Sequence, residues 1–270
     1  MKIKRAHLFA SIIFLTLSAL MFGTHASADT TVVVTQTNTQ GWSTEDTRPG
    51  GAVDFVTDMT APGGTGALQL TTDATTTSKA QYLHGTNTAL SGVTNLSYYT
   101  KQISASFVGG DPSYQLALCL NGFALNGDCL GFTTMVFEPY QNGTVTPGIW
   151  QSWDVDAGQF WSSRSASFGA CTVVAGFGGA PFYSLSQLKA NCPNAVAVAF
   201  GVNIGSNNPS YNVFTDLVRF NDTVYDFEVF SAPANKDQCK NGGWATFNPN
   251  RPAGPFKNQG DCVSFASNGK

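Results

Sequence analysis

Carboxylates are the side chains of this sequence best suited to chemistry. The chain has three glutamates, Glu45, Glu138 and Glu228, and fourteen aspartates among its 270 residues. Two carboxyl groups held roughly 5–5.5 Å or 6.5–9.5 Å apart can hydrolyse a glycosidic bond. Glu138 and Glu228 lie in or at the end of predicted strands, and strand pairing could bring them together. They are the candidate catalytic residues for a glycoside hydrolase or lyase, although each also fits an ordinary strand end.

Few residues of this sequence could act as an imidazole base or belong to a known nucleophile motif. There are three histidines, and His7 and His25 lie in a segment that we expect to be removed, which leaves His84. One histidine cannot build a histidine-rich zinc site. The sequence also contains no G-x-S-x-G, H-E-x-x-H or glycine-rich phosphate-binding motif. Binding is therefore expected ahead of catalysis.

Aromatic and amide side chains are typical of a surface that binds sugars. Aromatic rings stack on the flat C–H faces of sugars, while amide and acid groups bond their hydroxyls. Trp150 and Trp153 are three residues apart, so in a regular strand they face opposite sides. Trp161 lies in a turn-like stretch and is the first candidate for an exposed ring. The expected groove-lining set is Trp161, Trp150, Gln115, Asn203 and Asp216.

A structural calcium ion is a further possibility. Calcium prefers carboxylate and carbonyl oxygens, and the regions of the first and last predicted strands carry such groups. The candidate ligands are Asp54, Asp58, Asp222 and Asp226. No EF-hand spacing occurs, and no other cofactor is expected.

The first 28 residues predict an export signal. Basic residues precede an apolar run over 8–22, and Ala26-Ser27-Ala28 supplies a small-residue cleavage site before Asp29. Eleven basic side chains would then remain against seventeen acidic ones, a formal charge of −6. Nucleic acid is not an expected partner, because it requires clustered lysine and arginine. We expect a secreted or cell-surface protein with no membrane span after cleavage.

All six cysteines lie beyond this segment. An even number in an oxidising compartment predicts three disulfides, although six cysteines allow fifteen connectivities. Sequential pairs are expected because each close couple brackets a hairpin or loop. The pairs are Cys119–Cys129, Cys171–Cys192 and Cys239–Cys262.

Period-two alternation and turn residues predict an all-β chain. Residues 29–230 contain twelve short predicted strands at the spacing of a two-sheet antiparallel jelly-roll sandwich. One short helix is expected over 184–191, where Ser184 and Gln187 fit a capping box. Residues 231–236 are a predicted linker, and 237–270 a small C-terminal module closed by a disulfide.

Two strands suggest what the sandwich surface looks like. In 114–120, alternation puts Gln115 on one face and the tyrosine and leucines on the other. In 195–204, one face carries valines, Phe200 and Ile204. The opposite row of small residues ends in Asn203, and could either form the floor of a shallow groove or lie beneath a covering loop.

Several stretches resemble a group of secreted bacterial β-sandwich proteins. The stretches that show this resemblance are FVTDMTAPGGTGALQLTT (55–72), FTTMVFEPY (132–140), GTVTPGIWQSWD (143–154), AVAFGVNIGS (197–206) and TVYDFEVF (223–230). The resemblance implies a jelly roll like those of carbohydrate-binding modules. CKNGGWATF (239–247) and FKNQGDCVSF (256–265) are similar to a short module that ends many secreted bacterial proteins. No catalytic residue comes with either resemblance.

The leading expectation is a secreted or surface β-sandwich that binds an extracellular ligand, with a polysaccharide as the first choice. One alternative is a carboxylate-dependent glycoside hydrolase or lyase. The other is a structural envelope or matrix protein without a small ligand.

Overall fold

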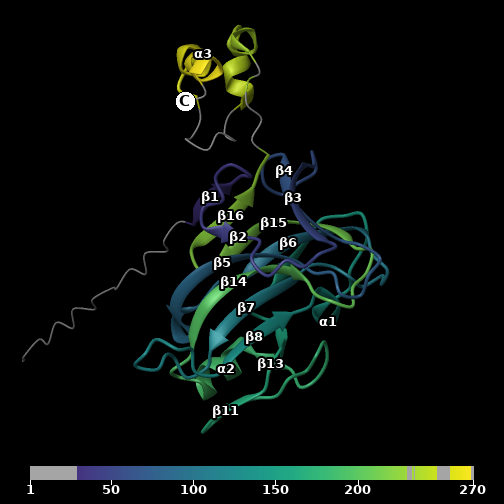
Figure 1. Cartoon of the computed structure of the whole chain (residues 1–270), viewed down its shortest axis with the longest axis vertical. Coiled ribbons are helices and arrows are strands. Elements are labelled where there is room, and N and C mark those ends of the chain that lie inside the picture. Colours follow the sequence, from purple (N-terminus) through teal and green to yellow (C-terminus); the bar gives the residue numbers. More distant parts are fainter. Residues whose placement is uncertain (1–28, 230–232, 234, 248–255, 269–270) are drawn as a thin grey trace, which may run out of the picture.

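Alternating polar and apolar residues fold most of the chain into two packed sheets. A computed structural model describes residues 29–229, 233, 235–247 and 256–268 (Figure 1). The predicted export signal and half of the predicted linker (231, 232 and 234) lie outside the described residues. None of the described helices combines the length and apolarity needed to cross a membrane.

The first sheet is organised around β15, which has different partners along its length. Its strands are β1 (Thr30–Val34), β3 (Gly51–Thr57), β4 (Gly66–Thr72), β6 (Ser97–Ser104), β9 (Gln151–Asp154), β15 (Asn212–Phe220) and β16 (Thr223–Phe227). On one side β15 pairs with β6, which pairs with β9. On the other side its first part pairs with β4 and then β3, and its last part with β16 and then β1. Only β1 and β16 run parallel among the named strand pairs.

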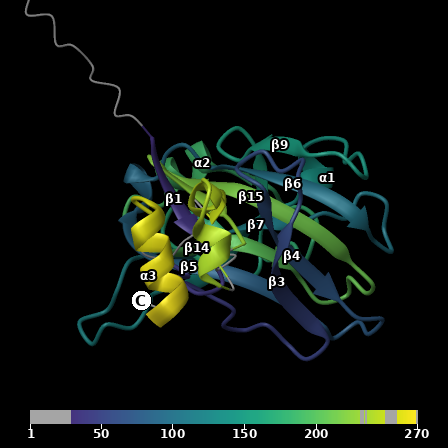
Figure 2. The ribbon, with the colours of Figure 1, turned by 90° about the horizontal axis from the view of Figure 1, so that it is seen from above.

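The second sheet has the order β13-β10-β8-β7-β14-β5-β2. Its strands are β2 (Trp42–Ser43), β5 (Ala80–Ala89), β7 (Ser113–Cys119), β8 (Phe132–Phe137), β10 (Gln159–Ser162), β13 (Tyr183–Ser184) and β14 (Val196–Ile204). A separate hairpin pairs β11 (Ala166–Phe168) with β12 (Cys171–Val173). In Figures 1 and 2 the two sheets pack face to face, and β15 contacts β14 across the interface. The chain is an all-β jelly-roll sandwich, as predicted.

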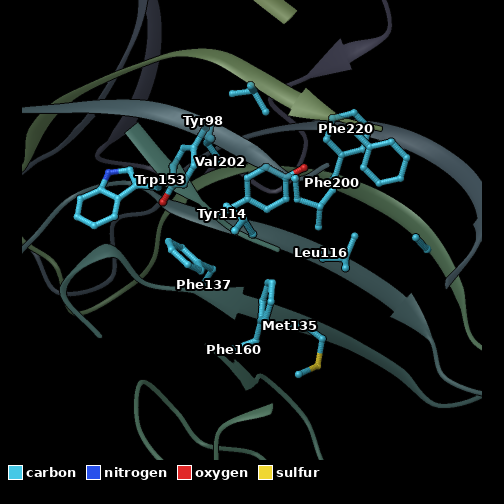
Figure 3. Close-up of a cluster of buried hydrophobic side chains, with 14 of the residues drawn as sticks. Tyr98, Tyr114, Leu116, Met135, Phe137, Trp153, Phe160, Phe200, Val202 and Phe220 are labelled. Carbon is cyan, nitrogen blue, oxygen red and sulfur yellow. The ribbon is translucent and has the colours of Figure 1, made fainter. Parts of the chain in front are cut away.

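The core fills the space between the sheets. Figure 3 shows Tyr98, Trp153 and Phe220 of the first sheet meeting side chains of the second. Tyr98 contacts Tyr114 edge to face, with ring centroids 5.5 Å apart, and the rings of Phe200 and Phe220 stack at 4.3 Å. Because Tyr114 points into this core, its neighbour Gln115 must point out of it.

A bulge changes which face of β14 the small residues occupy. The pairing of β14 with both neighbours shifts register between Ala197 and Ala199. Ala197 is therefore buried in the core, whereas Ala199 and Asn203 lie on the outer face. The predicted alternation is correct from Phe200 onward and reversed before the bulge, because the extra residue moves the pattern by one position.

The main predicted helix is present as α2 (Leu185–Asn191). The Ser184 hydroxyl accepts a hydrogen bond from the Gln187 backbone N–H, and the Gln187 side chain accepts one from the Ser184 N–H. This capping box satisfies two backbone donors that the first turn leaves unpaired. Two helices were not predicted, α1 (Pro139–Asn142) and α3 (Gln259–Asn268).

Three disulfides join the cysteines in sequential pairs. They connect Cys119 to Cys129, Cys171 to Cys192, and Cys239 to Cys262. The last of these belongs to a small apolar cluster of its own, in which Phe256 is almost fully buried. Such a small cluster has little apolar area to bury, so the covalent link contributes strongly to its stability.

Candidate binding groove

A groove of about 740 Å³ crosses the outer face of the second sheet. Strands β5, β14, β7, β8 and β10 form its floor, and loops from both sheets form its walls. Its floor residues are Gln81, Leu83, Gln115, Ala117, Thr134, Val136, Trp161, Val198, Ala199 and Asn203. The polar and small residues collect here because they are the alternate positions of strands whose other face is the core.

Amide side chains on three neighbouring strands form a hydrogen-bonded row. Asn203 Nδ2 donates to Gln81 Oε1 at 3.2 Å, and Gln81 Nε2 donates to the Glu45 carbonyl at 3.1 Å. Gln115 Nε2 donates to Ser113 Oγ at 2.7 Å. Each of these bonds uses one of the two N–H donors of its amide group, and Gln115 Oε1 and Asn203 Oδ1 accept no hydrogen bond from a described residue. The row therefore offers fixed acceptors to ligand hydroxyl groups.

Aromatic rings form the wall at the β8 end. Trp161, of β10, is partly exposed in the groove, and its buried Nε1 has no hydrogen-bond partner among the described residues. Tyr140 packs edge to face on Phe107 with centroids 5.3 Å apart, and its hydroxyl donates to the Gly178 carbonyl at 3.3 Å. The neighbouring Phe177 is exposed and also lines the groove.

Glu138 lies between these aromatic residues, directly after β8. Burial of its carboxyl raises the pKa to about 8, and the nearby indole N–H of Trp161 lowers it in part. The carboxyl is thus neutral and able to donate a hydrogen bond at neutral pH. Glu138 is the N-cap residue of α1, which begins at Pro139.

Asp111 is a second groove acid, but its carboxyl is closed to a ligand. Asp111 is only 4% exposed. Burial raises the pKa of its carboxyl to about 7, although a hydrogen bond from Thr100 lowers that pKa in part. Thr100 Oγ1 donates to Asp111 Oδ2, and Oδ1 is buried without a partner among the described residues.

Basic residues stand at two corners of the groove. At the β5 edge Lys79 Nζ lies 2.6 Å from Asp46 Oδ2, and Arg48 donates to Ser206 Oγ at 2.8 Å. Across the sheet, beyond the end of β10, the Arg164 guanidinium lies over the Phe132 ring, 5.3 Å from its centroid. Neither arginine forms a salt bridge with a described carboxylate.

Three of the five expected groove residues lie in the groove: Trp161, Gln115 and Asn203. Trp150 and Asp216 were predicted wrongly. Trp150 directly precedes β9 of the first sheet, and its Nε1 donates to Asp58 Oδ2 at 3.2 Å. Asp216 has no exposed surface and accepts backbone hydrogen bonds from Gly63, Leu217 and Phe227. Alternation along one strand cannot reveal which sheet that strand joins, so both errors have the same cause.

The expected acid pair does not form. Glu138 follows β8 of the second sheet, and Glu228 follows β16 of the first, where it is fully buried and accepts from the Thr65 N–H at 2.9 Å. His84 is likewise away from the groove, packed against the rings of Trp42, Phe200 and Tyr225.

The four aspartates considered for calcium do not converge. No group of three or more histidine, cysteine, aspartate or glutamate side chains is placed to hold a metal ion within the described ranges. Asp58 is instead paired with Lys101 at 2.7 Å, and Asp54 is exposed on β3. Asp222 lies in the turn before β16, and Asp226 is partly buried near Asp216.

Sequence reasoning missed three residues that shape the groove: Tyr140, Asp111 and Arg164. Tyr140 follows Glu138 by two positions, so a search around that acid could have found it. Asp111 and Arg164 lie in loops without periodicity, and no local signal marks them.

A scan against protein-family models gives no match, and a search of the curated proteins gives none either. Among solved structures, a family 11 carbohydrate-binding module from Clostridium thermocellum Lic26A-Cel5E is 11% identical, with a TM-score of 0.35, over 70% of this chain and 89% of its own. A family 11 module from the same organism, in complex with a β-1,3-1,4-mixed-linked tetrasaccharide, is 12% identical, with a TM-score of 0.38, over 70% and 91%.

The CBM22-1 xylan-binding domain of Paenibacillus barcinonensis Xyn10C is 17% identical, with a TM-score of 0.29, over 68% of this chain and 85% of its own. All three TM-scores lie below 0.5, so these likenesses assign neither a ligand nor a function to this chain.

Proposed function

We propose that this protein binds a polysaccharide chain in the groove of the second sheet. The observation that carries the proposal is a groove that Trp161 lines together with the oriented amide groups of Gln115 and Asn203. An aromatic ring supplies a stacking surface for the apolar face of a sugar, and fixed acceptors select its hydroxyl positions. A structural matrix protein without a ligand has no need for such a polar, open surface.

Binding fits the groove better than hydrolysis. A glycoside hydrolase needs two carboxyl groups that both reach the scissile bond. Glu138 reaches the groove, but Asp46 is held by Lys79 and Asp111 is buried with Thr100 on one oxygen. Among the described lining residues no second carboxyl is free to act as nucleophile or base.

Export to the cell exterior is part of the same proposal. The three disulfides support an oxidising compartment, and the predicted export signal at 1–28 would deliver the chain there. The intact mass of the protein recovered from the medium tests this.

The test of binding is Trp161→Ala, screened against soluble polysaccharides by affinity gel electrophoresis and titration calorimetry. We expect the association constant to fall about tenfold or more, because the stacking ring is lost. Trp161→Phe keeps a ring and should retain part of the affinity, which separates loss of stacking from misfolding.

Trp150→Ala is the matched control, because it removes an equivalent ring outside the groove. It should bind as the wild type does. Absence of binding to every polysaccharide by the wild type, or equal binding by Trp161→Ala and the wild type, contradicts the proposed function.

A further inference from the structure

We propose that the groove selects glycans that carry anionic groups, carboxylate or sulfate, and that the Arg164 guanidinium is the specificity-determining contact. The inference rests on the proposed polysaccharide function and names the ligand class of the same groove.

Arg164 is held rigidly at the groove wall through its backbone. Its N–H donates to Thr133 Oγ1 at 3.1 Å, and its carbonyl accepts from the hydroxyls of Ser162 at 2.8 Å and Thr133 at 3.3 Å. Ser162 and Thr133 are fully buried and bonded to each other at 2.7 Å. This anchoring by two buried hydroxyls fixes where the exposed side chain of Arg164 begins.

The side chain itself has no protein partner for its charge. The guanidinium lies over Phe132 and forms neither a hydrogen bond nor a salt bridge with a described residue. Stacking on a ring orients the plane of the guanidinium and leaves its N–H edge for a ligand. That edge matches the two oxygens of a carboxylate or sulfate in a bidentate contact.

The charge balance of the groove points the same way. Its lining contains Arg48, Lys79 and Arg164, three of the six basic residues in the range 29–229. The Asp46 carboxylate forms a salt bridge with Lys79 and also lies in the field of Arg48. Burial keeps the carboxyl groups of Asp111 and Glu138 largely neutral in mildly acidic solution, because it raises the pKa of each. Three cationic side chains therefore face one ionised carboxylate, in a protein whose overall formal charge is negative.

The two arginines are placed for an extended ligand. Arg48 pairs with Lys79 in an isolated β-bridge just before β5, whereas Arg164 follows β10. In the order β10-β8-β7-β14-β5, three strands lie between β10 and β5. Four strand spacings amount to about 19 Å, the length of several sugar units. Between them lie the Gln115 and Asn203 acceptors, so hydroxyl groups and anionic groups of one chain can bind together.

The test compares matched glycan pairs on the whole protein. Dextran sulfate is set against dextran, and polygalacturonate against its methyl ester, in affinity gels and calorimetry at 50 and 300 mM salt. We expect tighter binding to the charged member of at least one pair, with weaker binding as salt rises. The pair that shows the preference identifies the group as sulfate or carboxylate.

The variant is Arg164→Gln, which keeps a long polar side chain and removes the charge. We expect about a tenfold loss of affinity for the charged glycan and no change in the melting temperature. Lys240→Gln removes an exposed charge in the C-terminal residues and should leave affinity unchanged. Arg164→Lys should restore only part of it, because an ammonium group lacks the planar pair of donors.

Failure of this inference differs from failure of the proposed function. Tight binding of neutral glycans without a preference for charge leaves polysaccharide binding intact and overturns the anionic selection. An unchanged preference in Arg164→Gln also overturns it. Equal binding of a single-stranded DNA of similar length means unselective charge attraction and overturns it too, and no binding to any glycan removes both proposals.

Discussion

Glu138 shows how one residue can link the fold to ligand chemistry. It follows β8, next to Trp161, and its pKa of about 8 reflects burial between groove walls. The titratable groups that interact with it are Tyr98, Tyr140 and Tyr211, and burial raises the pKa of all three phenols. Glu138 is therefore expected to change charge near pH 8, and Asp111, whose pKa is about 7, changes charge at a lower pH.

We predict that binding of an acidic glycan weakens as pH rises from 6 to 9. Below pH 8 the Glu138 carboxyl is neutral and can donate a hydrogen bond, whereas above it the carboxylate repels an anion. Glu138→Gln, which stays neutral and keeps a donor, should bind with a weaker pH dependence over this range, and titration of the Asp111 carboxyl accounts for the part that remains. Calorimetric affinities at four pH values measure both curves, and parallel curves would contradict the assignment.

At the scale of an element, Asp216 closes a gap in the first sheet. β15 pairs with β4 through Thr215 and with β16 from Val218, and Leu217 between them has a left-handed backbone with φ of 47°. The Asp216 carboxyl accepts the N–H groups of Gly63, Leu217 and Phe227 that this break exposes. A residue predicted as a ligand contact thus satisfies the backbone instead.

Asp216 should make folding stability depend on pH. Burial, aided by the nearby Asp226 charge, raises its pKa from 3.8 to about 8. Because the native state binds this proton more tightly, the stabilisation is complete below pH 4 and lost as pH rises through 8. Burial also raises the pKa of Asp226, which acts in the same direction.

The melting temperature is therefore expected to fall by roughly 7–14 °C from pH 5 to pH 8, because a pKa raised from 3.8 to about 8 corresponds to about 3.5 kcal/mol over this range. Asp216→Asn should make this slope shallower, because the amide does not titrate, whereas the buried Asp226, Asp111 and Glu138 should keep part of it. Asp54→Asn, at an exposed site on β3, should keep it. Melting temperatures measured by calorimetry between pH 5 and pH 8 test this prediction. A slope in Asp216→Asn equal to that of the wild type would contradict the role of Asp216.

At the scale of the whole molecule, covalent links supplement a charge-poor sandwich. Only 11% of the residues are charged, and the three disulfides span sequence separations of 10, 21 and 23 residues. Loops of this length contribute on the order of 2–4 kcal/mol each when closed by a disulfide.

We predict that the protein collected from the medium begins at Asp29 and lacks free thiols. Its N-terminal sequence should read Asp29-Thr30-Thr31, and its intact mass should be six hydrogens below that of the fully reduced protein, one pair for each disulfide. Adding reductant should lower its melting temperature by more than about 5 °C. An unprocessed mass, or an unchanged melt after complete reduction, would count against export into an oxidising compartment.

The sequence by itself determined the features that depend on near neighbours along the chain. Period-two alternation put Gln115 and Tyr114 on opposite faces of one strand, and Trp150 and Trp153 on opposite sides of another; the structure buries Tyr114 and Trp153 in the core. Each close cysteine couple likewise predicted its own disulfide. Such features follow from strand and loop geometry over a few residues, and tertiary packing leaves them unchanged.

Only the tertiary structure decided which distant residues meet. Trp161, Gln115 and Asn203 share the groove because β10, β7 and β14 lie in one sheet, whereas Asp216 belongs to the other and Trp150 directly precedes its strand β9. The bulge in β14 and the loop that carries Arg164 depend on the same non-local pairing. Strand order is set by burying apolar area across the whole domain, and no short stretch of sequence contains that information.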